Sequence, residues 1–403
     1  MRLPAGGALR VSFGGASLGL IVAIGVAIRI LAAGVGPGLP SDALTFSRWA
    51  EDVARWGIGG YYAHGGDANY PAALYLFWPL GSAFDDGALR LAIRFLSIPF
   101  DVGIGVLLYR MGRQVGGPNA GLWAAGLYLL NPGIVLSGSF WGQLDSLGAL
   151  PMLASVQATV SRRTGLAAAL AVFAALVKTQ FGIAALILGA VLVLSARDSG
   201  SGRRIGLALG SAAATWAIVM FPLGLGVRHY GLILEKFYTA HRVGSSFAFN
   251  QWALLGGFQQ AEGAWFFVGT AAFLVAVGGA VLLLRRRRDL VGLLAVGFLI
   301  GLALYFLPTR VHERYLFGAV VFLAPLAGLY RSLRVPYAVL SVAWALAVLY
   351  VLAYAAALGD GLAAFDLPQV VVDIGVVVTM AAAVWCVARI WPLFFGRPEG
   401  TAA

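Results

Sequence analysis

Apolar stretches long enough to cross a lipid bilayer follow one another along almost the whole chain. The hydrocarbon core of a bilayer is about 30 Å thick and is crossed by roughly 20 apolar residues in a helix, and shorter spans are tolerated inside a bundle. The pattern predicts twelve transmembrane helices, near residues 12–33, 88–110, 119–137, 146–161, 164–178, 180–196, 204–224, 264–284, 290–308, 315–330, 336–358 and 368–391. We therefore expect an all-α polytopic membrane protein.

The composition supports this class and excludes others. Charged residues make up 11% of the 403 residues, hydrophobic residues make up 60%, and another 54 residues are glycine. So few charges cannot cover the surface of a water-soluble protein, and disordered chains have the opposite composition. The sequence has no internal repeat and no separate soluble segment. Residues 1–403 are therefore expected to form a single membrane domain.

The basic residues predict how the chain is oriented. A net charge of +11 would suggest a nucleic-acid partner in a soluble protein, but in a polytopic chain arginines mark cytoplasmic loops. They gather in alternate short loops, most densely at Arg285–Arg288, which is expected to anchor a span rather than bind a ligand. This predicts a plasma-membrane protein with both termini in the cytoplasm, a long first outer loop (34–89) and no nucleic-acid partner. The first span is expected to stay uncleaved, because its apolar run exceeds that of a signal peptide.

The first outer loop carries the strongest candidate for a catalytic carboxylate. Residues 41–56 predict a helix lying along the membrane interface, in which Asp42, Phe46 and Trp49 share one face. Asp42 fits equally well as a cap of that helix. The following segment, 70–84, is too short to span comfortably and contains two prolines, so it is expected to be re-entrant or interfacial.

Two further polar groups lie at predicted outer helix ends. The turn after the third span contains Trp141, Gln143 and Asp145, and Asp145 fits equally well as a cap of the next helix. Lys178 ends the fifth span and Gln180 follows two residues later. A lysine at this position can also simply reach the lipid headgroups. Both groups are candidates for a site on the outer face.

Asp101 differs from these residues because it lies in the middle of its predicted span. An intramembrane carboxylate has to be paired, protonated or solvated, so it faces the helix bundle or a cavity. An ion pair, a hydrogen bond inside the bundle and a role in the site are all compatible with the sequence.

The ninth span ends in a dense charged group, with Arg310, His312, Glu313 and Arg314 within five residues. One interpretation is a belt of charges that reaches the membrane surface. The other is a phosphate site, because arginine and protonated histidine offer charge-assisted hydrogen-bond donors.

A loop before the eighth span contains Asn250 and Trp252, which offer an amide and an aromatic face for a sugar. Metal chemistry has little support, because the sequence has no HExxH motif, no close pair of histidines and no DxD motif. We therefore expect neither a metal nor another cofactor.

In their order along the chain, these motifs resemble those of the membrane-embedded GT-C glycosyltransferases, which use polyprenyl-phosphate sugars. The similarity is closest to the bacterial and archaeal mannosyltransferases related to GPI mannosyltransferase II. The dolichyl-phosphate-glucose glucosyltransferases of N-glycan assembly are more distant. The resemblance covers roughly residues 35–320 and rests on Asp42 with Phe46 and Trp49, Tyr70-Pro71, Trp141-Gly142-Gln143-Leu144-Asp145, Lys178 with Gln180, and His312-Glu313-Arg314. The chain departs from the family at Asn69 and Ala72, where Asp-Tyr-Pro-Pro is frequent, and at Thr179, which separates the lysine from the glutamine.

The resemblance implies a GT-C-like bundle that transfers a hexose, most of all mannose, from a polyprenyl phosphate to a lipid-linked or cell-envelope acceptor at the outer face, with inversion. Asp42 takes the position of the family's first-loop acid and is expected to be the general base. Lys178, His312 and Arg314 are candidates to neutralise the leaving phosphate. The other expected substrate contacts are Trp49, Tyr70, Gln143, Asp145, Gln180, Asn250, Trp252 and Glu313. No cofactor is needed, because the sugar arrives activated on its lipid.

Two other functions stay open on the sequence. A secondary transporter of twelve helices fits the span count, although such transporters usually have two similar halves and a site at mid-membrane. A lipid-linked glycan polymerase or ligase would also act at the outer face. The sequence identifies neither the sugar nor the acceptor.

Overall fold

The computed structural model describes residues 17–36, 38–240, 242–359 and 367–396, and most of them are helical. The α-helices are α1 (Leu18–Val35), α2 (Pro40–Gly60), α3 (Leu74–Ala83), α4 (Asp86–Leu129), α5 (Pro132–Val135), α6 (Asp145–Val160), α7 (Thr164–Val177), α8 (Ile183–Leu194), α9 (Ser201–Met220), α10 (Val227–Ala240), α11 (Trp265–Leu283), α12 (Leu290–Phe306), α13 (Phe317–Leu329), α14 (Arg334–Gly359), α15 (Gln369–Ile390) and α16 (Pro392–Phe395). The predicted all-α class is confirmed.

Short helical segments and one strand pair connect these helices. The short segments are η1 (Tyr62–His64), η2 (Pro71–Ala73), η3 (Leu136–Trp141), η4 (Thr179–Gly182), η5 (Gln251–Leu254), η6 (Glu313–Leu316) and η7 (Arg331–Leu333). Within the described residues the only strands are β1 (Ser245–Ser246) and β2 (Val311–His312), which pair in parallel. This pair ties the loop before α11 to the segment after α12.

All twelve predicted apolar segments fall largely on helix. The second and third are joined in α4, which is kinked at Gly116 and Gly117. Gly117 has a φ of +78°, which glycine tolerates, and Pro118 suits the first turn after the kink. The first five residues of the first predicted span, and the terminal segments 1–16 and 397–403, lie outside the described residues.

Helix length supports membrane insertion but not the predicted count of spans. Five helical stretches in the described part of the chain are long and apolar enough to cross a membrane: Leu18–Val35, Asp86–Leu129, Trp265–Leu283, Arg331–Ala357 and Gln369–Phe395. Three further apolar stretches are shorter, namely Thr164–Val177, Thr179–Leu194 and Leu290–Phe306. The chain is therefore a multi-pass membrane protein, and twelve spans are not confirmed.

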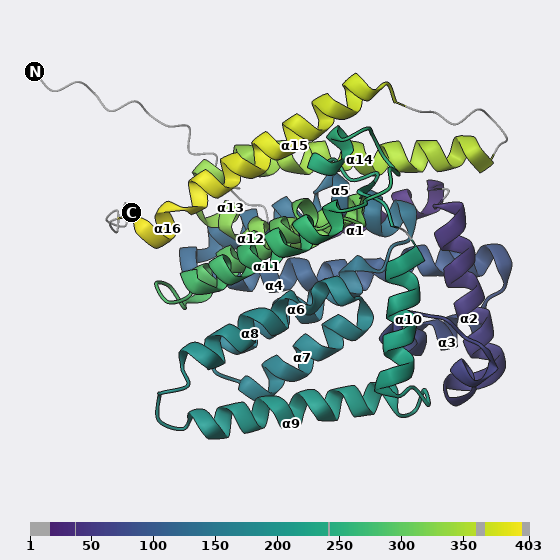
Figure 1. Cartoon of the computed structure of the whole chain (residues 1–403), viewed down its shortest axis with the longest axis horizontal. Coiled ribbons are helices and arrows are strands. Elements are labelled where there is room, and N and C mark those ends of the chain that lie inside the picture. The colour runs from purple at the N-terminus through teal and green to yellow at the C-terminus, as the bar shows by residue number, and fades with distance from the viewer. Residues whose placement is uncertain (1–16, 37, 241, 360–366, 397–403) are drawn as a thin grey trace, which may run out of the picture.

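The two ends of the bundle differ in what they carry. Figure 1 shows most of the long helices running in roughly the same direction, with α2, α3 and α10 at one end (right in the view). The turn between α8 and α9 and the arginine-rich turn between α11 and α12 lie at the opposite end (left in the view). This separation is the one that the topology prediction requires. Which end faces the cytoplasm stays a prediction.

α2 is the predicted interfacial helix, and it runs across the end of the bundle rather than along it (Figure 1). It begins at Pro40, whose fixed φ suits the first helical position, and it breaks at Gly57, whose φ is +70°. Phe46 and Trp49 are buried, as expected from their shared face, and the helix packs against α3. The segment 70–84 forms η2 and the ten-residue α3, which agrees with the short segment that the sequence predicts.

The mid-span carboxylate Asp101 forms a buried ion pair. Arg29 of α1 donates from Nε to Oδ2 at 2.8 Å, and both side chains are fully buried. The hydroxyls of Tyr128 and Ser146 donate to Oδ1 at 2.5 Å and 2.6 Å. Of the possibilities left open for Asp101, the structure shows the ion pair together with hydrogen bonds. Arg29 was not singled out in the sequence, although a cation inside an apolar run is itself a signal of such a partner.

Candidate active site

A cavity of about 750 Å³ opens at the end of the bundle that carries α2 and α10, a volume typical of small-molecule sites. Its wall combines the first turns of α2, the residues before α3, the turn before α6, the side of α10, the loop around β1, η6 and the C-terminal part of α14. Of the predicted site residues, those that line it are Asp42, Trp49, Tyr70, Gln143, His312, Glu313 and Arg314. Segments far apart in the sequence thus converge on one space.

Asp42 faces this cavity from the first turn of α2. Its carboxylate accepts hydrogen bonds from the indole N–H of Trp141, at 3.1 Å, and from the side-chain amide of Gln143. The residue before the helix is Leu39, and α2 has no side-chain cap. The capping interpretation of Asp42 is therefore wrong. Within the described residues Asp42 forms no ion pair. Its carboxylate, which could accept a proton, is therefore held in place by neutral donors.

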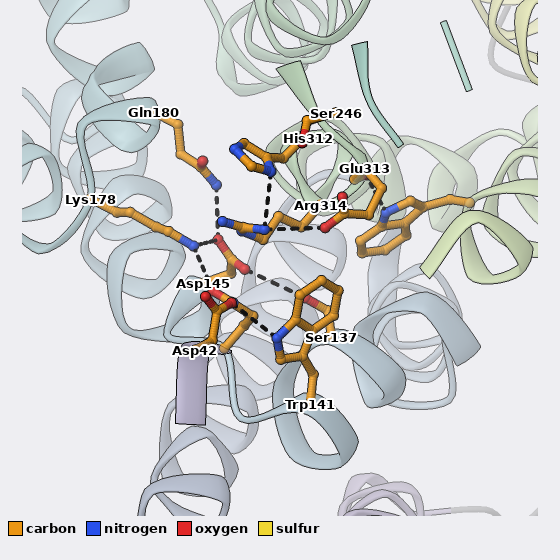
Figure 2. Close-up of polar contacts among 12 residues, drawn as sticks. Asp42, Ser137, Trp141, Asp145, Lys178, Gln180, Ser246, His312, Glu313 and Arg314 are labelled. Atoms are coloured by element: carbon orange, nitrogen blue, oxygen red, sulfur yellow. Dashed lines mark hydrogen bonds and ion pairs between the residues drawn. The ribbon is translucent and has the colours of Figure 1, made fainter. Parts of the chain in front are cut away.

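Asp145 and Lys178 form a buried pair behind this carboxylate (Figure 2). The Lys178 ammonium donates to Asp145 Oδ1 at 2.8 Å and to Gln143 Oε1 at 3.0 Å. Gln180 donates to the same Asp145 oxygen at 2.8 Å. Asp145 therefore does not cap α6, and Lys178, which is 2% exposed, does not reach the headgroups. These hydrogen bonds form a continuous chain that runs from Asp145 through Lys178 and Gln143 to Asp42.

The placement of Lys178 differs from the predicted contact with a donor phosphate. It follows the last residue of α7 and is not one of the cavity-lining residues, whereas its neighbour Thr179 is. The two short bonds of Lys178 instead suit a residue that positions Gln143 and Asp145.

His312, Glu313 and Arg314 come together at the segment between α12 and α13. The guanidinium of Arg314 lies 3.2 Å from the Glu313 carboxylate, 3.5 Å from His312 Nδ1 and 5.5 Å from the ring centre of Trp141. The indole N–H of Trp344 donates to the Glu313 carbonyl at 2.9 Å and fixes this segment to α14. The three side chains line the cavity and Glu313 is 1% exposed, so the interpretation as a surface charge belt is wrong.

Arg314 is the cation best placed to meet an anion in the cavity. Burial acts to lower its pKa, but the carboxylates of Glu313 and Asp42 outweigh that effect and raise it. Burial raises the pKa of Glu313, against the opposing effect of Arg314. The Nε of Arg314 is buried without a hydrogen-bond partner in the described residues. Arg314 thus keeps its charge and has one donor unused.

An aromatic wall covers one side of the cavity. The ring of Tyr70 meets the ring of Trp49 edge-on at 5.7 Å, and Phe46 packs 5.6 Å from Trp49. The indole N–H of Trp49 is held by Asp67 at 2.9 Å. Burial raises the pKa of Tyr70 to about 12, so its hydroxyl stays protonated as a hydrogen-bond donor. Such a wall can pack against the apolar face of a sugar ring.

Asn250 and Trp252 lie apart from these residues. The Asn250 amide donates to the carbonyl of Tyr305 at 3.1 Å, and the Trp252 indole donates to the carbonyl of Pro308 at 2.8 Å. Neither side chain lines the cavity. Their bonds fasten the loop around η5 to the end of α12, and the structure does not bring them to the predicted substrate.

Several lining residues were not proposed from the sequence as substrate contacts. Trp141, which orients Asp42, lies inside a quoted motif, so its position was available as a signal. Phe247, Gln259 and Arg310 also line the cavity and have φ values of +63°, +61° and +63°, which bulky residues rarely adopt. Such backbone conformations concentrate at functional sites. No local pattern predicts them, because they depend on the loop being held by β1 and β2, and by the bonds of Arg310 to Glu262.

The cavity therefore combines one carboxylate without an ion pair in the described residues, one histidine, an aromatic wall and two partly buried arginines, of which Arg310 is paired with Glu262 and Arg314 with Glu313. Among the same residues, no three His, Cys, Asp or Glu side chains are grouped so that they could hold a metal ion. This set can accept a proton from a hydroxyl group and stabilise an anion in the same space.

Several solved structures resemble the fold of this chain at low sequence identity. ArnT from Cupriavidus metallidurans, bound to undecaprenyl phosphate, matches with a TM-score of 0.53 and 18% identity over 95% of this chain and 79% of that chain. The fold is GT-C-like. Arabinosyltransferase EmbB from Mycobacterium smegmatis gives a TM-score of 0.47 and 20% identity, over 99% of this chain and 40% of that one.

The archaeal oligosaccharyltransferase AglB from Archaeoglobus fulgidus, in complex with an inhibitory peptide and a dolichol-phosphate, gives a TM-score of 0.46 and 17% identity over 93% of this chain and 55% of that one. The present chain thus spans about half or less of AglB and EmbB. No family model matches the sequence, and no curated protein has a significantly similar sequence.

Proposed function

We propose that the protein transfers a hexose from a polyprenyl-phosphate donor to a hydroxyl group of a lipid-linked or cell-envelope acceptor. The observation that carries this proposal is Asp42, which faces the cavity between two neutral donors and has no ion pair in the described part of the chain. Arg314 lines the same cavity, where a leaving phosphate needs a cation. The GT-C-like fold supports a lipid-linked donor, because ArnT was solved with undecaprenyl phosphate.

In the proposed reaction, the acceptor hydroxyl oxygen attacks C1 of the sugar while its proton passes to the Asp42 carboxylate. The bond between C1 and the phosphate oxygen breaks, and its electron pair stays on the phosphate. Arg314 and His312 stabilise the charge that develops there, mainly in the transition state. A single attack from the face opposite the leaving group inverts the configuration at C1. Lys178 positions the base through Gln143.

Finer features belong to the same proposal. The order of motifs supports mannose as the sugar, and the helical character of every predicted apolar segment supports twelve spans in one membrane domain over residues 1–403. The arginine-rich turns and the cavity lie at opposite ends, which supports an active site on the outer face and cytoplasmic termini.

The deciding experiment replaces Asp42 with asparagine in protein reconstituted in lipid nanodiscs. Asparagine keeps the size and can accept the bonds from Trp141 and Gln143, but it cannot take the proton. Transfer of radiolabelled mannose from polyprenyl-phosphate-mannose to extracted membrane glycolipids is expected to fall about 10²–10⁴-fold. Thermal unfolding should stay unchanged, and Glu51→Gln, exposed on the same helix, should retain activity.

Two outcomes would count against the proposal. Near-normal transfer by Asp42→Asn would reject the base assignment. Absence of transfer by the wild-type protein from any polyprenyl-phosphate hexose would reject the function and favour a transporter.

The orientation has its own test. Ala63→Cys places an exposed thiol just beyond α2, and Asp198→Cys places one between α8 and α9, at the opposite end of the bundle. The native Cys386 is buried and gives little background. An impermeant maleimide added to intact cells is expected to label Ala63→Cys alone. Labelling of Asp198→Cys alone would reverse the orientation, and labelling of both would overturn the topology.

A further inference from the structure

A second, smaller cavity lies on the other side of Trp141 from the candidate active site. It encloses about 140 Å³, and liquid water takes about 30 Å³ per molecule, so it holds a group of phosphate size. It is formed where the start of α2, the first turns of α4 and the turn after Trp141 meet. Its nine lining residues include two arginines, Arg90 and Arg94, and no acid. Phe46 and Trp141 line both cavities and separate them.

The two arginines are poorly neutralised. Arg90 and Arg94 are four residues apart on α4, a spacing that puts both side chains on one face. Asp85 and Asp86 begin the same helix, yet no ion pair of either arginine is found in the part of the chain that the structure describes. The Nε of Arg94 is buried without a hydrogen-bond partner among the described residues. A buried donor left unbonded costs free energy, which an anionic ligand would recover.

Two glycines let the backbone approach closely beside Arg94 and Trp141, while Arg90 is exposed at the edge of the pocket. Gly142 has a φ of +95°, and a Cβ there would lie 3.1 Å from Cγ of Arg94. Gly38 has a φ of +70°, and a Cβ there would lie 3.2 Å from the carbonyl oxygen of Trp141. Any larger residue at either position would strain the backbone and crowd the arginine or the turn. The pocket is thus shaped by the turn and does not result from a loosely placed surface arginine alone.

We propose that Arg90 and Arg94 bind the phosphate group of a membrane lipid at a site separate from the donor phosphate in the larger cavity. Arginine offers planar, bidentate donors that suit phosphate oxygens, and this pair has charge, an unused donor on Arg94 and no counter-ion within the described residues. The lipid is either a prenyl phosphate or a phospholipid, since both present the same group at the membrane surface. The site does not depend on the proposed transfer reaction.

The test counts bound lipids by native mass spectrometry of the full-length protein in detergent, with farnesyl phosphate as the probe. The wild-type protein is expected to bind two molecules, one in each cavity. Arg90→Gln combined with Arg94→Gln should remove one of them or weaken its binding about tenfold or more, as expected for a lost charge-assisted bond. Arg314→Gln should remove the other. Arg110→Gln with Arg113→Gln, two exposed arginines further along α4, is the matched control and should change nothing.

Competition then identifies the source of the phosphate. If dioleoylphosphatidylglycerol displaces one farnesyl phosphate from the wild type, and this displacement is absent in the Arg90/Arg94 double variant, the site binds phospholipid headgroups. Resistance to that lipid assigns it to prenyl phosphates, and farnesol should not bind there in either case. The inference is overturned if the Arg90/Arg94 double variant keeps wild-type stoichiometry and affinity, or if the wild type binds one molecule that Arg314→Gln removes. If the protein fails to transfer sugar, the numbers of farnesyl phosphate molecules bound by the wild type and by the double variant would not be affected.

Discussion

Two neighbouring residues at the start of α6 form hydrogen bonds in two different polar networks. Ser146 donates to Asp101, which is paired with Arg29 inside the bundle. Asp145 is paired with Lys178 behind the candidate active site. Both carboxylates are fully buried and both have one basic partner. Burial and pairing therefore do not distinguish the structural region from the functional one.

The difference lies in where each network ends. Both oxygens of Asp101 are occupied by charged or hydroxyl donors, and no member of that group lines either of the two cavities described above. The Asp145 network continues through Lys178 and Gln143 to Asp42, which faces a cavity of about 750 Å³. A closed network holds helices together, whereas an open one presents a group that can react. Access to a cavity is the stronger indication of function.

The closed network should be the more costly to break. Asp101→Ala leaves Arg29 buried without its counter-charge and is expected to lower the free energy of unfolding by about 3–5 kcal/mol. The measurement is denaturant unfolding of the purified protein in detergent. Arg29→Met combined with Asp101→Asn removes both charges and is expected to restore much of the loss. Full stability of Asp101→Ala would show that this pair does not hold α1 to α4.

The open network should respond in substrate binding instead. Arg314→Gln removes the cation of the larger cavity and is expected to raise the KM for the lipid donor about 10–100-fold, as for a lost charge-assisted bond of about 1.5–3 kcal/mol. Arg314→Lys keeps the charge without the planar donors and should be intermediate. Because Glu313 loses its partner in the first variant, Glu313→Gln with Arg314→Gln is the control for buried charge. Equal changes in the KM of donor and acceptor would contradict the assignment.

The smallest effect is expected in the pH dependence. Loss of the proton from the Lys178 ammonium at high pH removes its charge-assisted donors. The bonds to Gln143 and Asp145 then weaken, and activity should fall on the alkaline side. Lys178→Arg stays charged and is expected to move that alkaline limb of kcat/KM to higher pH. Lys236→Arg, an exposed lysine on α10, should leave the profile unchanged, and an identical profile for Lys178→Arg would reject this role.

Much of the fold could be predicted from the sequence because its determinants are local. Apolar runs of spanning length specify buried or lipid-facing helices wherever they occur, and every predicted run falls largely on helix. The face of α2 that carries Asp42, Phe46 and Trp49 follows from helical periodicity alone. The order of short motifs also predicted seven of the residues that line the larger cavity.

The sequence could not predict which polar groups meet, because partners across helices are set by packing and not by spacing in the chain. Arg29 and Asp101 are 72 residues apart, and nothing local distinguishes their closed pair from a site. Asn250 and Trp252 have a composition suited to sugars, yet they bind the backbone at the end of α12. The helices and the membrane environment follow from the sequence alone, and the side of the membrane that carries the site stays a prediction. The packing of those helices decided which carboxylate is neutralised and which faces an open cavity.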